Sequence, residues 1–434
     1  MSAAVTNPAP QQPAAPERVL LKAPVSWKIP IILTVLAVLA FVLFGAMGNS
    51  GSATFKLAMD GDAFALPDLV LPGRVTGIVV GVLLLVVAGW SVALKRSGRK
   101  LPTWVVVVFG VLFVLGFLAW AVSGGSTPTM SLTSLLKGAL SFGIPLVFGS
   151  LSGVLGERSG VVNIAIEGQL LGGAFSAALF GSVFHNAYLG LICAAVAGAL
   201  VSMVLAVFSI KYRVNQIIVG VVLNVLVSGL TGFLFGQVMA ADPEAYNQPP
   251  RLDRWNIPGL AQIPVIGPIF FQQTIIGYLL YIAVFVVWYA LRNTRWGLRT
   301  RAVGEHPKAA DTLGVKVNSL RFWNVTLGGA VAGIGGAYFT LEAVESFTKD
   351  MSGGRGFIAL AALILGRWNP IGAALAALLF GFADNLASIL SIVGTPVPSQ
   401  FLEMLPYVVT VLAVAGVVGR SRGPAAAGEP YVKE

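Results

Sequence analysis

Two polar side chains interrupt the otherwise apolar stretch Val161–Phe184 and could do chemistry there. Asn163 and Glu167 are four residues apart and would share one face of a helix. An ionised carboxylate buried in an apolar helix is costly unless it is paired, so such a glutamate is a candidate functional group. The structural alternative is that Glu167 binds Arg158 or a nearby backbone group. The residues alone leave both interpretations open.

A second candidate is the polar segment 292–321, whose first half is densely basic. Pro307 suits the first position of a helix, Ala309 and Ala310 favour helix, and Gly314 suits the position that ends it. The pattern predicts a short helix held between two apolar segments, where a soluble partner could dock. An ordinary basic loop is the alternative, because such loops commonly flank apolar spans.

Other chemistries lack the residues they need. The sequence has no G-x-x-x-x-G-K-[ST] loop to hold the phosphates of ATP. Its single cysteine, Cys193, and two histidines, His185 and His306, exclude a disulfide framework within the chain and the usual zinc spacings. No Ser/His/Asp arrangement or paired carboxylates are discernible. We therefore expect no enzyme activity, no metal and no cofactor.

The composition places these candidates in a membrane protein. Of the 434 residues, 56% are hydrophobic and 11% are charged, and the mean hydropathy is +0.84. A soluble domain carries about 25% charged residues. This chain could not cover a water-facing surface of its size, and its 51 glycines suit helices packed closely in lipid.

Regular apolar runs near the length of about 20 residues that crosses a bilayer recur along the chain. They are Ile29–Met47, Thr76–Leu94, Trp104–Val122, Ala139–Gly156, Leu189–Ile210, Ile217–Val238, Thr274–Leu291, Phe322–Leu341, Ile371–Phe382 extended to about Leu390, and Leu405–Val418. Two more stretches, Val161–Phe184 and Phe357–Gly366, are irregular, and the second is too short to span unaided. We predict an all-α polytopic transmembrane helical bundle of about 12 spans (10–12), in which these two are broken or re-entrant helices.

The charges test this topology. With twelve spans both termini lie on one side, which then carries 21 of the 28 lysines and arginines. Acidic residues gather on the other side: Asp60, Asp62, Asp68, Asp242, Glu244, Asp253, Glu345 and Asp350. By the positive-inside rule we expect a multi-pass plasma-membrane protein with both termini in the cytoplasm. The basic charge follows the topology, so no nucleic-acid partner is expected.

The chain divides into four expected parts. Residues 1–28 form a disordered cytoplasmic tail, because the first sixteen are rich in Ala, Pro and Gln. Residues 29–128 form an accessory three-helix transmembrane extension. Residues 129–419 form the core and include the cytoplasmic loop 292–321. Residues 420–434 form a cytoplasmic C-terminal tail.

The two irregular stretches occupy similar places in two halves of the core. Interrupted helices in corresponding positions are the best pointer from sequence to a transport path. We therefore assign a candidate substrate path to Asn163, Glu167, Gln169, Asn224 and Gly356. For Asn224 the alternative is a hydrogen bond between helices.

Three motifs carry a resemblance to a known family. Gly304-Glu-His-Pro-Lys-Ala-Ala-Asp-Thr-Leu-Gly-Val315 resembles the coupling-helix motif of ABC importer permeases of the branched-chain amino acid and ribose superfamily. Gly156-Glu-Arg-Ser-Gly-Val-Val-Asn-Ile-Ala-Ile-Glu-Gly-Gln-Leu-Leu-Gly-Gly173 resembles the nucleoside and simple-sugar permease subgroup. Gly353-Gly-Arg-Gly-Phe357, continued to Gly372, is similar to the same subgroup. Together they cover about Ser131 to Gly419.

The resemblance implies a permease that works by alternating access. It implies a cytoplasmic ABC ATPase, a second homologous permease subunit and an extracytoplasmic substrate-binding lipoprotein as partners, besides membrane lipid. ATPase coupling would fall on Gly304, Glu305, His306, Pro307, Ala309, Ala310, Gly314 and Val315. Nucleosides are the substrates it favours, with a pentose as the first alternative. An ion-coupled secondary transporter is the alternative of another class.

Overall fold

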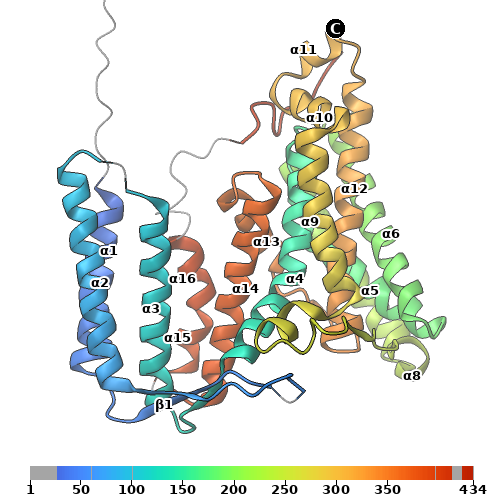
Figure 1. Cartoon of the computed structure of the whole chain (residues 1–434). Coiled ribbons are helices and arrows are strands. Elements are labelled where there is room, and N and C mark those ends of the chain that lie inside the picture. The colour runs from blue at the N-terminus through green and yellow to red at the C-terminus, as the bar shows by residue number, and fades with distance from the viewer. Residues whose placement is uncertain (1–26, 60, 100, 396, 413–422, 434) are drawn as a thin grey trace, which may run out of the picture.

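The computed structural model describes residues 27–412 and 423–433, apart from residues 60, 100 and 396. The expected N-terminal tail therefore lies outside the described residues up to Ser26. Three helices come first: α1 (Lys28–Ala40), which continues as a π-helical segment Phe41–Ala46, α2 (Gly73–Arg96) and α3 (Thr103–Ser123). They stand together at one side of the molecule (Figure 1) and share a core around Leu33, Phe44 and Leu84.

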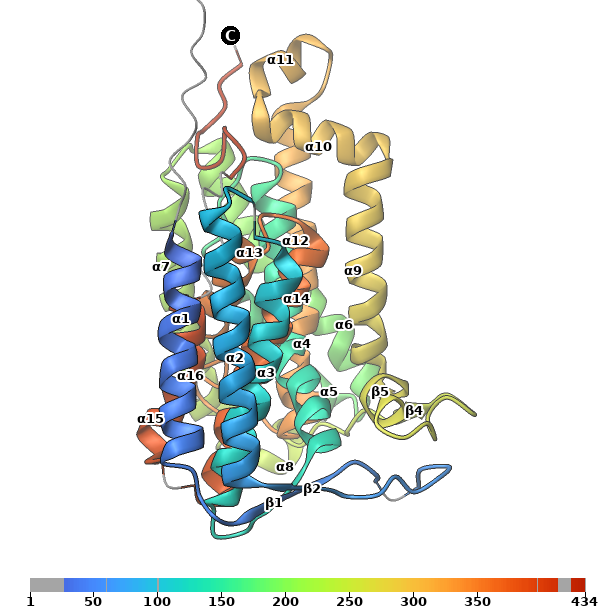
Figure 2. The ribbon, with the colours of Figure 1, turned by 60° about the vertical axis from the view of Figure 1, so that its left-hand side comes forward.

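The remaining long helices form the larger bundle in Figures 1 and 2. They are α4 (Leu132–Glu157), α5 (Ile166–Val183), α6 (Ala187–Ala206), α7 (Gln216–Leu234), α9 (Ile275–Asn293), α12 (Val317–Tyr338), α13 (Arg355–Leu365) and α14 (Pro370–Val393). Short helices are α8 (Pro243–Tyr246), α10 (Arg295–Glu305), α11 (Pro307–Thr312), α15 (Ser399–Glu403) and α16 (Leu405–Leu412). Further π-helical segments are Val207–Lys211, Phe235–Met239, Gly267–Phe271 and Phe339–Ala343.

Within the described residues, eight helices are long and apolar enough to cross a membrane: Lys28–Ala46, Gly73–Arg96, Trp104–Ser123, Leu132–Glu157, Ala187–Lys211, Gln216–Met239, Ile275–Asn293 and Pro370–Val393. The prediction of a helical multi-span protein is thus confirmed, whereas a count of about twelve is not. α5 and α12 fall outside this set, and α13 has only 11 residues. The last predicted span is described only as far as Leu412.

Short strands, which the sequence analysis did not predict, lie in the segments that connect the helices. β1 (Ser52–Lys56) pairs antiparallel with β2 (Leu69–Pro72) and parallel with β3 (Thr129–Ser131). The register sets Thr54 opposite Thr129, so this sheet ties the loop after α1 to the start of α4. A second pair joins β4 (Arg254–Asn256) to β5 (Gln272–Thr274). Segments of three to five residues are too short to show a strand period in sequence.

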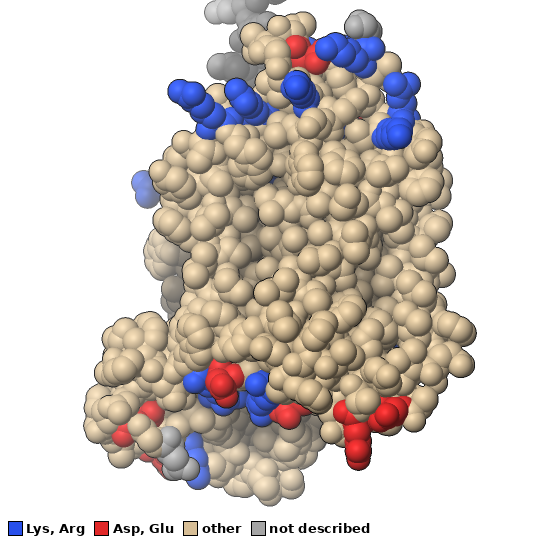
Figure 3. All heavy atoms as spheres, turned by 90° about the vertical axis from the view of Figure 1, so that its right-hand side faces the viewer, with Lys and Arg blue, Asp and Glu red and all other residues tan. Residues whose placement is uncertain are grey.

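The two ends of the bundle differ in charge. We name them the α11 end and the α8 end, after the short helices that they carry. Figure 3 shows lysines and arginines gathered around the α11 end and most of the visible acidic groups at the α8 end, with an uncharged band between them. A band without charge is the surface that a bilayer core requires, because an ionised group is expensive there.

Small residues let the central helices approach closely. α12 packs along α6, α4 and α5. A Cβ added to Gly333 on α12 would lie 2.1 Å from the Ala194 carbonyl oxygen, and one added to Gly198 on α6 would lie 2.2 Å from the Gly329 carbonyl oxygen. The Gly329/Gly333 spacing is therefore used for helix packing, as small residues in membrane helices commonly are.

Replacing Gly333 with valine should separate α6 from α12 and abolish folding. The matched control is Gly229→Val on α7, where an added Cβ meets nothing within 4 Å. Size-exclusion chromatography of the detergent-solubilised protein should show a monodisperse peak for the control and aggregate for Gly333→Val. A monodisperse Gly333→Val protein would contradict the packing described here.

Candidate functional site

The carboxylate of Glu167 lies at the start of helix α13. One of its oxygens, Oε1, accepts hydrogen bonds from the Ser352 hydroxyl (2.6 Å) and the Gly354 N–H (2.8 Å). The other, Oε2, accepts from the Gly356 N–H (2.6 Å). The first N–H groups of a helix have no partner within the helix, and a negative charge there is favourable. Glu167 thus caps α13 from a different helix, 189 residues away from Gly356 in sequence.

Glycines make this contact possible. Gly353 and Gly354 have positive φ angles of 55° and 80°, a conformation that glycine adopts without strain. A Cβ on Gly356 would lie 2.4 Å from the Glu167 backbone nitrogen. The chain turns abruptly into α13 because glycine allows both the left-handed turn and the close approach of α5.

A second set of polar contacts holds the segment before α5. Asn163 is fully buried, and its amide donates to the Ser152 hydroxyl (3.0 Å) and the Gln169 Oε1 (3.2 Å). Gln169 returns a bond from Nε2 to the Asn163 Oδ1 (2.9 Å). Asn224 on α7 donates to the Ile164 carbonyl (2.9 Å) and accepts from the Gly168 N–H (2.8 Å). The two Asn224 bonds satisfy backbone groups that the interrupted helix leaves free, whereas Asn163, Ser152 and Gln169 satisfy one another.

The structure therefore brings the two irregular stretches together. We name the set Asn163, Glu167, Gln169, Asn224 and Gly356 the polar hub. Its side-chain oxygens and nitrogens bind protein groups, and Arg158 bonds to the Trp368 carbonyl instead of Glu167. Of the two structural alternatives weighed for Glu167, the bond to backbone is the one observed. Whether the hub also contacts substrate remains a prediction.

A polar cavity that sequence reasoning missed lies nearer the α8 end. Its volume is about 550 Å³. It is lined by Ser141, Phe142, Pro145, Arg251, Arg254, Tyr338, Phe339, Glu342, Ala343, Val344, Thr348, Met351 and Arg355. Glu342 accepts a hydrogen bond from the Thr274 hydroxyl, and Arg251 pairs with Glu345 at 2.9 Å. The signal available in sequence was Glu342, at the end of a predicted span, together with three arginines on the side that carries fewer basic residues, Arg251, Arg254 and Arg355.

The predicted short helix is present at the α11 end. α11 begins at Pro307 and is followed by Gly314, whose φ is 81°. His306 occupies the N-cap position without a side-chain cap bond. Ala310 is buried, whereas Leu313, which the sequence analysis did not single out, is 84% exposed.

The C-terminal segment 423–433 packs beneath this helix. The Ala426 N–H donates to the Gly304 carbonyl (2.9 Å), and Tyr431 is buried with Val303 and Ala310. The buried guanidinium of Arg321 donates to the Ser159 carbonyl (3.1 Å) and the Glu429 carbonyl (2.7 Å). The described part of the expected C-terminal tail thus connects α10 and α11 to α12 and to the loop before α5.

Replacing Glu167 with glutamine should destabilise the protein, because an amide nitrogen cannot accept a hydrogen bond from a helix N–H. An unsatisfied buried donor costs about 1–3 kcal/mol. We expect the apparent melting temperature in detergent to fall by several degrees and uptake to fall with it. Glu244→Gln, at an exposed glutamate of α8, is the control. Equal melting temperatures for both variants would remove the capping role.

Comparison with known proteins identifies the family. The model of the branched-chain amino acid transport system / permease component family matches residues 135–414. The chain is 40% identical to the guanosine ABC transporter permease protein NupQ of Bacillus subtilis (70% of this chain, 97% of the relative). It is also 40% identical to the nucleoside ABC transporter permease protein NupC of Lactococcus lactis (70% of this chain, 98% of the relative). The putative glucose ABC transporter permease protein TsgC13 of Haloferax volcanii is 32% identical (66% of this chain, 92% of the relative).

No solved structure matches the chain. The family match covers more than half of the sequence, and the first two relatives are matched over nearly their whole length. These relatives are permease proteins of transporters, which confirms the expectation of a transport subunit. The chain belongs to the permease component family of ABC transport systems.

Proposed function

We propose that this chain is the permease subunit of an ATP-driven importer that moves nucleosides across the plasma membrane by alternating access. The observation that carries the substrate class is the 40% identity to two nucleoside-type permeases over nearly their whole length. The cavity near the α8 end supports it, because a nucleoside needs both an aromatic surface and polar partners.

In this proposal the α11 end and both termini face the cytoplasm, as the distribution of basic residues favours. A cytoplasmic ABC ATPase docks on α11, and Leu313 enters a pocket on that partner. Closure of the ATPase then displaces α11 together with the C-terminal segment 423–433. Because Arg321 connects that segment to α12 and to the loop before α5, the displacement reaches the polar hub.

The substrate path in this proposal starts at the cavity and continues toward the polar hub. Phe142, Tyr338 and Phe339 line the cavity and offer rings on which a base can stack. Arg254 and Glu342 offer a donor and an acceptor for the base edge or the ribose hydroxyls. An extracytoplasmic binding lipoprotein delivers the nucleoside from the α8 end, and a second, homologous permease completes the path.

The similarity to a putative glucose permease keeps a simple-sugar importer as the second candidate. The hydrogen bonds of Glu167 argue against an ion-coupled transporter. A coupling site needs a carboxylate with oxygens open to the ion, and both oxygens of Glu167 accept bonds from protein groups.

Uptake of labelled guanosine and labelled ribose tests the substrate class. Cells that carry the partner subunits should lose guanosine uptake when this gene is deleted and keep ribose uptake. The wild-type gene should restore uptake, whereas Ala343→Trp should not, because the indole would fill the cavity. Ala240→Trp, at an exposed position outside the cavity lining, is the matched control. Loss of ribose uptake alone would assign a pentose importer.

Replacing Leu313 with serine tests the docking surface. Loss of an apolar anchor at an interface weakens binding by roughly tenfold or more. We expect less ATPase to co-purify with the variant, and uptake to fall, at normal expression of the permease. Leu298→Ser is the control, since Leu298 is an exposed leucine (62%) on α10. Unchanged co-purification with Leu313→Ser would place the ATPase contact elsewhere.

A further inference from the structure

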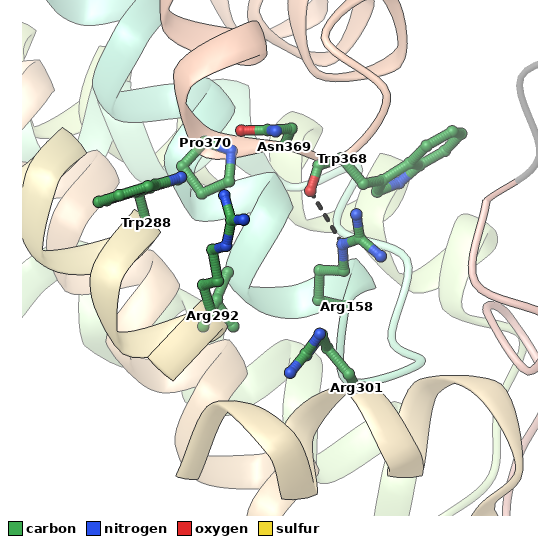
Figure 4. A pocket seen from close by; sticks show the side chains of 8 residues that line it. Arg158, Trp288, Arg292, Arg301, Trp368, Asn369 and Pro370 are labelled. Atoms are coloured by element: carbon green, nitrogen blue, oxygen red, sulfur yellow. Dashed lines mark hydrogen bonds between the residues drawn. The ribbon is translucent and has the colours of Figure 1, made fainter. Parts of the chain in front are cut away.

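Three arginines from separate elements line one pocket at the α11 end (Figure 4). Arg158 is the C-cap residue of α4, Arg292 lies in the last turn of α9 and Arg301 lies on α10. The pocket has a volume of about 220 Å³, and its other lining residues are Trp288, Leu291, Trp368, Asn369 and Pro370. Elements far apart in sequence thus converge to place guanidinium groups around a small space.

A strained turn holds the first of these arginines in place. The Arg158 Nε donates to the Trp368 carbonyl (2.9 Å), and its Nη2 lies 3.5 Å from the Arg367 carbonyl. Arg367 and Trp368 have consecutive positive φ angles of 56° and 54°. Such conformations are unfavourable for residues other than glycine and persist where the surrounding structure demands them. Here the turn presents two carbonyl groups that orient Arg158.

The three arginines of the pocket form no ion pair with a described carboxylate, and Glu305 acts on Arg158 only from a longer distance. Burial lowers the pKa of Arg158, the charge of Glu305 opposes that effect, and the charge of Arg301 adds to it. α14 also starts at this pocket, with Asn369 as its N-cap residue, and the N-terminus of a long helix is electropositive. An anion here would relieve the repulsion.

The surroundings of the pocket indicate where such an anion comes from. α9 stands at the edge of the bundle and leads directly into α10 (Figure 2). Its outward face exposes Ile282, Phe285, Val286 and Tyr289. Arg292 lies over the Trp288 ring, 5.8 Å from its centroid. Tryptophan beside arginine at the end of an apolar helix is typical of the membrane–water interface.

We propose that this pocket binds the phosphate of an anionic phospholipid headgroup, with the acyl chains lying along α9. Guanidinium groups bind phosphate oxygens through paired hydrogen bonds, and basic pockets between membrane helices bind lipid phosphates. The three arginines supply the donors, and the exposed apolar face of α9 supplies the surface for the chains. Binding of phosphate here does not depend on which solute the chain transports.

Native mass spectrometry of the full-length protein with its partner subunits tests this site. The probes are phosphatidylglycerol, phosphatidylcholine and soluble glycerol 3-phosphate. The variant is Arg292→Gln with Arg301→Gln, which leaves the contacts of Arg158 with the Arg367 and Trp368 carbonyls intact. The control is Arg295→Gln with Arg299→Gln, an equal change of charge on α10 at residues that do not line the pocket.

The wild type and the control should bind phosphatidylglycerol equally well, whereas the variant should bind it at least about tenfold more weakly, since each arginine near the headgroups contributes roughly 1 kcal/mol. Preference for phosphatidylglycerol over phosphatidylcholine should shrink in the variant alone. Equal loss in the control would overturn the site, because general charge would then explain binding. If the variant bound glycerol 3-phosphate more weakly but bound phosphatidylglycerol as well as the wild type, the pocket would be a phosphate site. The proposal that a lipid supplies the phosphate would then be overturned.

Discussion

The bond between the Glu167 carboxylate and the start of α13 is the interaction on which the architecture of the core depends. A helix that begins inside an apolar bundle exposes N–H groups that no water can satisfy, and each unsatisfied group is costly there. Glu167 satisfies the Gly354 and Gly356 N–H groups and the Ser352 hydroxyl. Asn224 meets the same requirement at the start of α5, where it accepts from the Gly168 N–H and donates to the Ile164 carbonyl. The two interrupted helices are therefore stable side by side, because α5 provides the carboxylate that binds the free N–H groups at the start of α13.

Close packing of the other core helices holds these polar groups within hydrogen-bond distance of one another. Glycines at the α6–α12 crossing allow backbone to approach backbone, so α12 lies deep among α4, α5 and α6. At the α11 end, Arg321 links α12 to the loop before α5 and to the C-terminal segment. Tyr431 of that segment is buried with Ala310 of α11. In the proposed mechanism, a movement of α11 reaches the polar hub through these contacts.

The two ends of the bundle carry different groups, which the proposals above assign to different ligands. The α8 end has a cavity with aromatic, acidic and basic groups, which suits a polar solute with a flat ring. The α11 end offers an exposed leucine on a short helix and a pocket of three arginines, which suit a protein partner and a phosphate. The uncharged band between the ends separates the two sets of groups (Figure 3).

The sequence by itself determined the helical membrane class, the two interrupted segments and the short helix after Pro307, because composition, apolar length and helix-end residues are local properties. Family motifs added the permease assignment. Only the tertiary structure decided that Glu167 binds the start of α13, that Arg321 holds the C-terminal segment, and that Arg158, Arg292 and Arg301 share one pocket. These pairings join residues up to 189 positions apart. The residues that surround a carboxylate, a guanidinium or a glycine in the sequence do not indicate which distant residue it will contact. Packing of α5 against α13 selects that partner, because it brings the free N–H groups at the start of α13 to the Glu167 carboxylate.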